Sequence, residues 1–291
     1  MDKIKNYIKL MRINHYLKNI LIFLPLLFSA SLFKVDLLIK TFVGFIVFSL
    51  IASTVYIIND ICDKENDKKH EVKKNRPIAS GKVSVAGAII LAIVLMIISV
   101  LLNIYIVGWN IYSYIVVFLY LALNLCYSFG LKNKPIIDII ILVSGFILRL
   151  IYGSIITSIA LSNWLYLTFM AASFYMGLGK RRNEILKQGD KSREVLKRYS
   201  KSFLDKNMYV CVTLCIVFYS LWAVDSLTIF NIGHELLIWT IPLVIIILMK
   251  YSLNIEGDSY GDPIDVVLAD KMLLTLILVY GAVMFTLIYL I

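Results

Sequence analysis

Long apolar segments recur along nearly the whole chain of 291 residues, separated by polar loops. A helix needs about 20 apolar residues to cross the hydrocarbon core of a bilayer, and these segments have that length. Hydrophobic residues make up 60% of the sequence and charged residues 16%, which is too apolar for a soluble domain of this size. The sequence predicts an all-α polytopic membrane protein, a single integral membrane domain over residues 1–291. We expect nine transmembrane helices, near residues 15–33, 37–58, 84–107, 110–129, 135–158, 162–179, 208–227, 236–252 and 271–291.

The basic residues follow the loops. All but three of the 29 Lys and Arg fall in the N-terminal segment, in loops 59–83, 130–134 and 180–207, and at the edges of the last loop. Cytoplasmic loops carry such an excess of cations. We therefore expect a plasma (inner) membrane protein with a cytoplasmic N-terminus and, after nine spans, the C-terminus outside. The positive charge then reflects topology, and no nucleic-acid partner is expected; the sequence leaves a monomer and a homo-oligomer open.

An acidic stretch follows the second apolar segment. If a helix continues through residues 59–67, Asp60, Asp63 and Asp67 share one face, because they are spaced i, i+3 and i+7. Three neighbouring carboxylates repel each other, and a divalent cation relieves that repulsion. Oxygen ligands suit Mg²⁺, which is usually held by carboxylates together with substrate phosphate oxygens. The three Asp are therefore candidate metal ligands and catalytic residues, and the alternative is a solvated acidic helix end.

Polar side chains on the same predicted cytoplasmic side are candidate substrate-binding residues, because cations and hydrogen-bond donors hold phosphates. They are Lys18, Asn59, Arg76, Tyr127, Lys132, Lys180 and Arg181. The last loop contributes two further candidates, Asp262 and Asp265, for which the sequence allows two roles, helix capping or substrate binding. Capping is an alternative because Asp262 precedes a proline, as an N-cap residue often does.

Arg149 lies within an apolar segment. A cation inside the membrane is costly and usually faces a polar cavity or a partner, so Arg149 is also a candidate substrate-binding residue. The obvious acidic partner, Asp138, is eleven residues earlier on the same predicted helix. That separation is about three turns, too far for direct contact, which favours a polar cavity.

These residues resemble the UbiA superfamily of intramembrane prenyltransferases. Its first signature, Asn-Asp-x-x-Asp-x-x-x-Asp, is matched at 59–67, and the resemblance covers nearly the whole chain and implies a nine-helix UbiA-like bundle. The second Asp-rich motif of most members is replaced here by Gly-Lys-Arg-Arg-Asn-Glu at 179–184. Other motifs resemble the decaprenyl-phosphate phosphoribosyltransferase branch: Tyr-Leu-Lys-Asn at 16–19, Arg-Pro-Ile-Ala-Ser-Gly at 76–81, Tyr-Ser-Phe-Gly-Leu-Lys at 127–132, Arg149 with Gly153, Gly-Lys-Arg at 179–181, and an acidic segment at 262–270.

The resemblance implies a Mg²⁺-dependent membrane transferase. It would move 5-phosphoribose from phosphoribosyl diphosphate to a polyprenyl phosphate and release diphosphate, in cell wall biosynthesis. The three Asp would hold Mg²⁺, and Asn59 would orient either the metal shell or a phosphate oxygen. The cations would bind phosphates, Tyr127 would donate a hydrogen bond, and Asp262 and Asp265 would accept from ribose hydroxyls. Two alternatives remain. One is a UbiA-type transferase moving an isoprenyl group from its diphosphate to an aromatic acceptor. The other is a lipid transporter, against which stand the one-sided polar groups and the lack of an obvious repeat.

Overall fold

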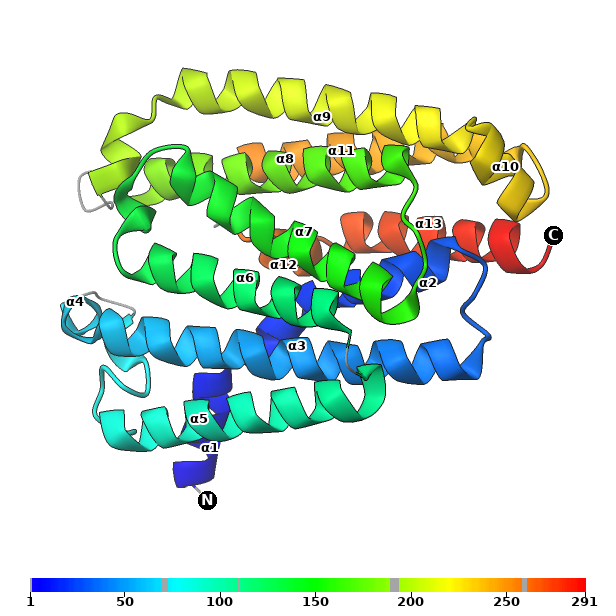
Figure 1. The fold of residues 1–291 in the computed structure, drawn as a ribbon. Helices are drawn as coiled ribbons and strands as arrows, with labels where there is room; N and C mark the ends of the chain where they lie inside the picture. The colour runs from blue at the N-terminus through cyan, green and yellow to red at the C-terminus, as the bar shows by residue number, and fades with distance from the viewer. Residues whose placement is uncertain (1, 70–72, 109, 189–193, 258–260) are drawn as a thin grey trace. The chain divides into compact units, whose positions relative to one another are not determined.

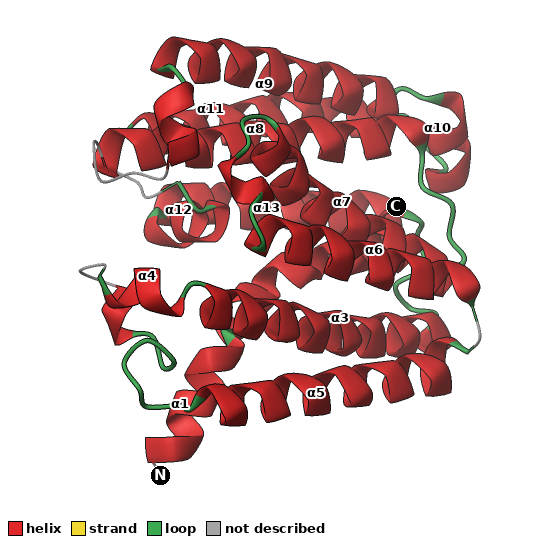
Figure 2. Cartoon of the chain, turned by 60° about the vertical axis from the view of Figure 1, so that its left-hand side comes forward, coloured by secondary structure: helices red, strands yellow, loops and turns green. Residues whose placement is uncertain are grey.

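The computed structural model describes residues 2–69, 73–108, 110–188, 194–257 and 261–291, and these residues form helices and loops without a strand (Figures 1 and 2). This confirms the prediction of an all-α protein. The described chain groups into two compact units. Unit 1 comprises Met1–Leu26, Leu32–Lys132 and Leu148–Ile159, and unit 2 comprises Leu27–Ser31, Asn133–Ile147 and Ala160–Ile291. A single domain over residues 1–291 stays a prediction.

Unit 1 is organised around α3 (Val35–Cys62), the longest helix of the described chain. In Figure 1, α5 (Val85–Leu102) runs antiparallel beside it. Phe48, Ile51 and Val55 of α3 are buried in a cluster that also includes Tyr120 and Tyr152. The remaining elements of unit 1 are α1 (Asp2–Met11), η1 (Ile13–Phe23), α4 (Lys64–Lys68), η2 (Lys73–Asn75), the π-helical η3 (Asn103–Val107) and α6 (Ile111–Ser128).

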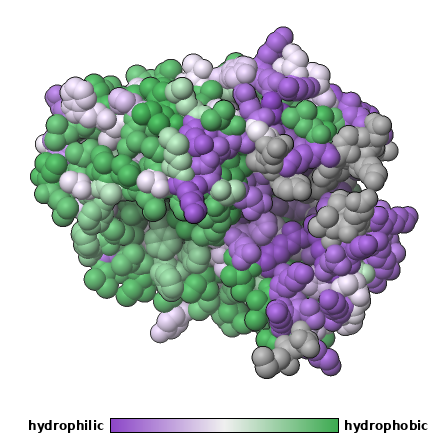
Figure 3. All heavy atoms as spheres, turned by 180° about the vertical axis from the view of Figure 1, so that it is seen from behind, coloured by the Kyte–Doolittle hydropathy of each residue, from purple (hydrophilic) through white to green (hydrophobic). Residues whose placement is uncertain are grey.

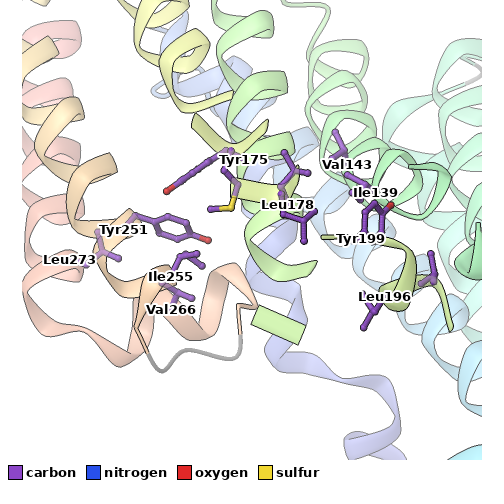
Figure 4. Close-up of a cluster of buried hydrophobic side chains, with 13 residues drawn as sticks. Ile139, Val143, Tyr175, Leu178, Leu196, Tyr199, Tyr251, Ile255, Val266 and Leu273 are labelled. Carbon is purple, nitrogen blue, oxygen red and sulfur yellow. The ribbon is translucent and has the colours of Figure 1, made fainter. Parts of the chain in front are cut away.

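Unit 2 is built on the antiparallel pair α8 (Asn163–Gln188) and α9 (Lys201–Ala223), which lie side by side in Figure 1. Its larger hydrophobic cluster includes Tyr175, Tyr251 and Ile255 (Figure 4). The remaining elements are η6 (Glu194–Arg198), α10 (Ser226–Ile232), η7 (Leu236–Thr240), α11 (Ile241–Glu256), α12 (Pro263–Ala269) and α13 (Lys271–Tyr289). Three elements contribute residues to both units: α2 (Leu24–Phe28), η4 (Leu131–Asn133) and α7 (Ile137–Thr157).

Polar side chains define where several of these helices begin. Ser84 accepts a hydrogen bond from the backbone N–H of Gly87 at 3.1 Å at the start of α5, and Ser200 accepts from Phe203 at 3.0 Å at the start of α9. The first N–H groups of a helix have no partner within the helix, so a side-chain acceptor at this position stabilises the start. The apolar runs thus become helices with defined first residues.

Seven helices of the described chain are long and apolar enough to cross a membrane, and the prediction of nine is not confirmed. The expected span at 15–33 is absent as a long α-helix, because the chain there forms the 3₁₀ helix η1 and the five-residue α2. The expected span at 162–179 lies in α8, which is 26 residues long but continues into the charged residues that end it. The seven helices are Val35–Cys62, Val85–Ile106, Ile111–Ser128, Ile137–Thr157, Lys201–Ala223, Leu236–Glu256 and Lys271–Tyr289.

The surfaces of these helices carry large apolar side chains. Figure 3 shows broad hydrophobic areas on one face of the molecule. Phe118 on α6 is 70% exposed and Leu278 on α13 is 64% exposed. Apolar side chains are this exposed over whole helices where the surrounding solvent is lipid rather than water, so the surface fits a membrane protein.

Candidate functional site

The acidic stretch at 59–67 lies at a break between two helices of unit 1. α3 ends at Cys62, and Asp63 adopts φ −90° and ψ 2° before α4 begins at Lys64. The three carboxylates share one face only if a single helix continues through residues 59–67. The break replaces that arrangement, so Asp63 has different partners from Asp60 and Asp67.

Asp60 and Asp67 are joined by one arginine. Nη1 of Arg76 donates to Oδ1 of Asp60 at 3.1 Å and to Oδ2 of Asp67 at 2.7 Å. Nη2 of Arg12 donates to the same Oδ1 of Asp60. Both carboxylates are buried, and a buried carboxylate is stable only when it is paired or hydrogen-bonded. Two guanidinium groups and two carboxylates therefore form one network.

Asp63 belongs to a second group that ties α3 to the end of α6. Nζ of Lys132 donates to Oδ1 of Asp63 at 2.5 Å, and Nδ2 of Asn59 donates to its Oδ2 at 3.2 Å. The hydroxyl of Ser128 donates to Oδ1 of Asn59 at 3.1 Å. Because both ends of the Asn59 amide are used, its orientation is fixed. Tertiary packing thus brings Asn59, Asp63 and Lys132 together, and their role in a common site stays a prediction.

The donor chemistry of the three Asp fits Mg²⁺, because carboxylate oxygens are its usual protein ligands. Asp60 and Asp67 flank a single cationic nitrogen of Arg76, so one positive group already contacts both. Within the described residues, no three His, Cys, Asp or Glu side chains converge on one point that could hold a metal ion. The reason is that Asp63 is directed to Lys132. The assignment of the three Asp as metal ligands stays a prediction.

Arg149 is buried within unit 1 and lies among polar and aromatic groups. Its Nε donates to Oδ1 of Asn19 at 2.6 Å and its Nη2 to the hydroxyl of Tyr120 at 3.2 Å. The guanidinium carbon also lies 5.0 Å from the ring centroid of Phe48. Asn19 is fully buried and donates in turn to Ser49 at 2.8 Å. These contacts satisfy a membrane-buried cation and connect α7 to η1.

Three consecutive basic residues near the end of α8 each contact a carboxylate from a different part of the chain. Lys180 lies 3.4 Å from Asp262, and Nε of Arg182 donates to Asp205 of α9 at 2.6 Å. Nε of Arg181 donates to Asp138 of α7 at 2.6 Å. This basic triplet therefore organises its end of unit 2. Lys180 is the most exposed of the three, with 26% of its side chain accessible.

Asp138 is fully buried and accepts a second hydrogen bond, from the hydroxyl of Tyr199 at 2.6 Å. Burial raises the pKa of Tyr199 well above its usual value, and the hydrogen bond to Asp138 raises it further. Tyr199 therefore stays protonated as a donor. Arg181 also donates from Nη1 to Glu184 at 2.5 Å, so it contacts two carboxylates while it is 1% exposed.

Asp262 caps α12, since its Oδ1 accepts from the backbone N–H of Ile264 at 3.2 Å, and its Oδ2 faces Lys180. The capping alternative for Asp262 is therefore realised. Asp265 is exposed in the first turn of the same helix, where a negative charge is favourable.

The predicted residues thus fall into two sets in different units. Lys18 is half-buried on η1, directly before Asn19, and Tyr127 is half-buried in the last turn of α6. Arg12 was missed by the sequence reasoning because it counts among the N-terminal cations that the topology explains. The set in unit 1 is Lys18, Asn59, Asp60, Asp63, Asp67, Arg76, Tyr127, Lys132 and Arg149, and the set in unit 2 is Lys180, Arg181, Asp262 and Asp265.

The fold and its apolar helices define the class of the protein: a polytopic α-helical membrane protein. Among solved structures it is similar to a UbiA homolog from Archaeoglobus fulgidus bound to GPP and Mg²⁺, with a TM-score of 0.69 and 17% identity over 97% of this chain and 99% of that chain. It is also similar to a structure described for digeranylgeranylglyceryl phosphate synthase, with a TM-score of 0.62 and 19% identity. These likenesses support the UbiA-like bundle.

The chain belongs to the UbiA prenyltransferase family, which it matches over residues 20–277. It is 34% identical over 279 residues to the decaprenyl-phosphate phosphoribosyltransferase of Corynebacterium glutamicum, covering 94% of this chain and 83% of the relative. It is 33% identical over 293 residues to the decaprenyl-phosphate phosphoribosyltransferase of Mycolicibacterium smegmatis, covering 95% and 90%. The resemblance that the motifs indicated is confirmed.

Proposed function

We propose that the protein is a membrane phosphoribosyltransferase that transfers 5-phosphoribose from phosphoribosyl diphosphate to a polyprenyl phosphate and releases diphosphate. The observation that carries this proposal is the similarity, along most of both chains, to relatives named decaprenyl-phosphate phosphoribosyltransferase. The paired carboxylates and cations of unit 1 add chemical support, because both substrates are phosphorylated anions.

The donor diphosphate needs compensation of its negative charge as the bond from C1 to oxygen breaks. Asp60, Asp63 and Asp67 would hold Mg²⁺, which supplies Lewis-acid stabilisation of the leaving diphosphate when bound. Arg76 and Lys132 contact these carboxylates and carry charges that suit phosphate oxygens. Of the basic triplet of unit 2, Lys180 is the residue with enough exposure to contact a phosphate. Asp265, exposed on α12, would accept from a ribose hydroxyl.

The acceptor requires little activation by the protein. A lipid phosphate is already ionised at neutral pH, so an oxygen can attack C1 without a general base. This agrees with a carboxylate and cation network that includes no histidine in its described contacts. The polyprenyl chain would lie against the apolar helix surfaces.

We place the acidic break and the basic triplet on the cytoplasmic side of the plasma membrane. The distribution of Lys and Arg among the loops supports this orientation. A multiply charged phosphoribosyl donor does not cross the hydrocarbon core unaided, so a site open to the cytoplasm would use donor from that side.

A second candidate is transfer of an isoprenyl group from its diphosphate to an aromatic acceptor. It is favoured by the family and by the similarity to a UbiA homolog whose structure contains GPP and Mg²⁺. Against it stands the segment at 179–184 of α8, which is basic and lacks the second Asp-rich motif expected of such enzymes.

The test is diphosphate release by the purified protein in detergent with Mg²⁺ and a polyprenyl phosphate. Phosphoribosyl diphosphate and geranylgeranyl diphosphate are compared as donors. Asp63→Ala is compared with the control Glu65→Gln, which removes the charge of an exposed carboxylate in the same stretch. Release from phosphoribosyl diphosphate that Asp63→Ala abolishes and Glu65→Gln retains supports the proposal. Release only from geranylgeranyl diphosphate with an aromatic acceptor establishes the second candidate, and release from neither overturns both.

A further inference from the structure

Arg12 occupies an unusual backbone position at the junction between α1 and η1. Its φ of 54° and ψ of 51° lie in the left-handed region, which a residue with a long side chain seldom adopts. Such conformations persist only where the surrounding structure holds them, and they are enriched at functional sites. The turn is held by backbone hydrogen bonds on both sides, from Arg12 to Lys9 and from His15 to Arg12.

The side chain of Arg12 reaches the acidic break of α3. Its guanidinium carbon lies 5.1 Å from the ring centroid of Tyr56, and its Nη2 donates to Oδ1 of Asp60. Arg76, which directly follows η2, donates to that same oxygen of Asp60 at 3.1 Å. Two guanidinium groups therefore converge on one carboxylate oxygen.

The two arginines are accessible to solvent and the carboxylate beneath them is not. The side chain of Asp60 is 3% exposed, whereas those of Arg12 and Arg76 are 21% and 26% exposed. An anion that approaches from solvent would therefore meet guanidinium groups before it met a carboxylate. A guanidinium has five N–H donors. Within the described chain, the side-chain hydrogen bonds of Arg12 and Arg76 are those to Asp60 and Asp67, so donors remain for another acceptor.

We propose that Arg12 is a further substrate-binding residue, and that Arg12 and Arg76 together bind the diphosphate group of the donor. This rests on the proposed function. The planar fork of a guanidinium matches two phosphate oxygens at once, and two such forks side by side suit a diphosphate better than a single phosphate. A divalent cation that binds Asp60 replaces the arginines as its partner, and the charges of both arginines then serve the diphosphate.

The test measures binding rather than turnover, with Arg12→Gln, Arg12→Lys and the control Lys68→Gln, which removes an exposed cation from the same end of unit 1. Inorganic diphosphate with Mg²⁺, and Mg²⁺ alone, are titrated calorimetrically into the purified protein in detergent. We expect Arg12→Gln to weaken diphosphate binding about 10-fold or more, because a charge-assisted contact is lost, and Arg12→Lys to weaken it less. Arg12→Gln should bind Mg²⁺ alone as tightly as the wild type or more tightly, because the guanidinium that competes for Asp60 is gone.

Several results would overturn the inference. Unchanged diphosphate binding in Arg12→Gln is one. Another is a lower melting temperature in Arg12→Gln and Arg12→Lys together with equally weakened binding of diphosphate and of Mg²⁺ alone. That result would show that Arg12 has only a structural role. A rise in KM for polyprenyl phosphate, with no change for phosphoribosyl diphosphate, would assign Arg12 to the acceptor instead. If the wild-type protein uses phosphoribosyl diphosphate and Arg12→Gln binds diphosphate normally, only the role proposed for Arg12 fails. If the wild-type protein releases no diphosphate from that donor, the proposed function fails.

Discussion

Arg181 donates from Nε to Oδ2 of Asp138 at 2.6 Å, and both side chains are almost completely buried. This ion pair connects the end of α8 to the start of α7 within unit 2. The sequence suggested that Arg181 binds phosphate, yet its guanidinium also contacts Glu184 and leaves little surface for a ligand. We infer that Arg181 positions Lys180, the neighbour with a more accessible side chain.

Removal of Arg181 should destabilise the protein. In Arg181→Met, Asp138 remains buried without its cation, and loss of one member of a buried pair costs about 3–5 kcal/mol of the free energy of unfolding. The double variant Asp138→Asn/Arg181→Met removes both charges and keeps an acceptor for Tyr199, so it should recover part of the loss. Denaturation in detergent measures both. A wild-type melting temperature in Arg181→Met together with a raised KM for the donor would instead show that Arg181 binds substrate.

Lys132 should affect donor binding more than stability. Its side chain and that of Asp63 are 17% and 18% exposed, and Asn59 also donates to Asp63, so the carboxylate keeps a partner and contact with solvent when Lys132 is removed. Lys132→Met should raise the KM for phosphoribosyl diphosphate about 10-fold, because a phosphate-binding charge is lost. Steady-state kinetics of Lys132→Met are compared with those of the control Lys134→Met, which removes an exposed cation two residues away. Equal kinetics in the two variants would remove Lys132 from the site.

Arg149 should contribute to stability through Asn19. Arg149→Met leaves the buried Oδ1 of Asn19 without the donor at 2.6 Å, and an unsatisfied buried acceptor costs about 1–3 kcal/mol. Tyr120→Phe removes only the acceptor at 3.2 Å and should cost less. Unfolding in detergent gives both values. If Arg149→Met unfolds as the wild type does but binds the acceptor poorly, Arg149 faces substrate.

Gly153 should not tolerate a methyl group. A Cβ at this position would lie 2.2 Å from the backbone oxygen of Ile22 in η1, and a backbone atom cannot move aside easily. Gly153→Ala should therefore destabilise the protein by about 1–3 kcal/mol. Gly281 lies in the interior of α13, where a Cβ would meet no atom within 4 Å. Gly281→Ala should therefore raise the free energy of unfolding by about 0.5–1 kcal/mol, through helix propensity. Equal shifts in melting temperature for Gly153→Ala and Gly281→Ala would contradict the close contact between α7 and η1 at Gly153.

Cys62 should report the side of the membrane. It is a free, exposed thiol next to the acidic break. Because Cys126 is also an exposed free thiol, the test uses the Cys126→Ser variant. A membrane-impermeant maleimide should label Cys62 in inverted vesicles and not in right-side-out vesicles, and adding Cys62→Ser should remove that label. Labelling from the outside would reverse the proposed orientation.

The class and family of the protein follow from local features of the sequence. Segment length and hydropathy predict membrane-spanning helices, because crossing a bilayer requires a fixed number of apolar residues. The motif at 59–67 identifies the family, because its residue types and spacing are contiguous. The number of nine spans is not confirmed: residues 15–33 are apolar enough, but they form a 3₁₀ segment and the short α2. Close contacts to other elements, such as that of Ile22 with Gly153, shape this segment, and hydropathy does not record them.

The partners of the charged residues were decided by tertiary structure. Asp60 meets Arg12 across 48 positions of sequence, and Asp63 meets Lys132 across 69. Nothing in the local pattern distinguishes Arg12 from its basic neighbours or shows that Arg181 is buried. A side chain becomes a ligand, a cap or an ion-pair partner according to which groups packing brings within hydrogen-bond distance, and for residues this far apart only the folded chain sets that distance.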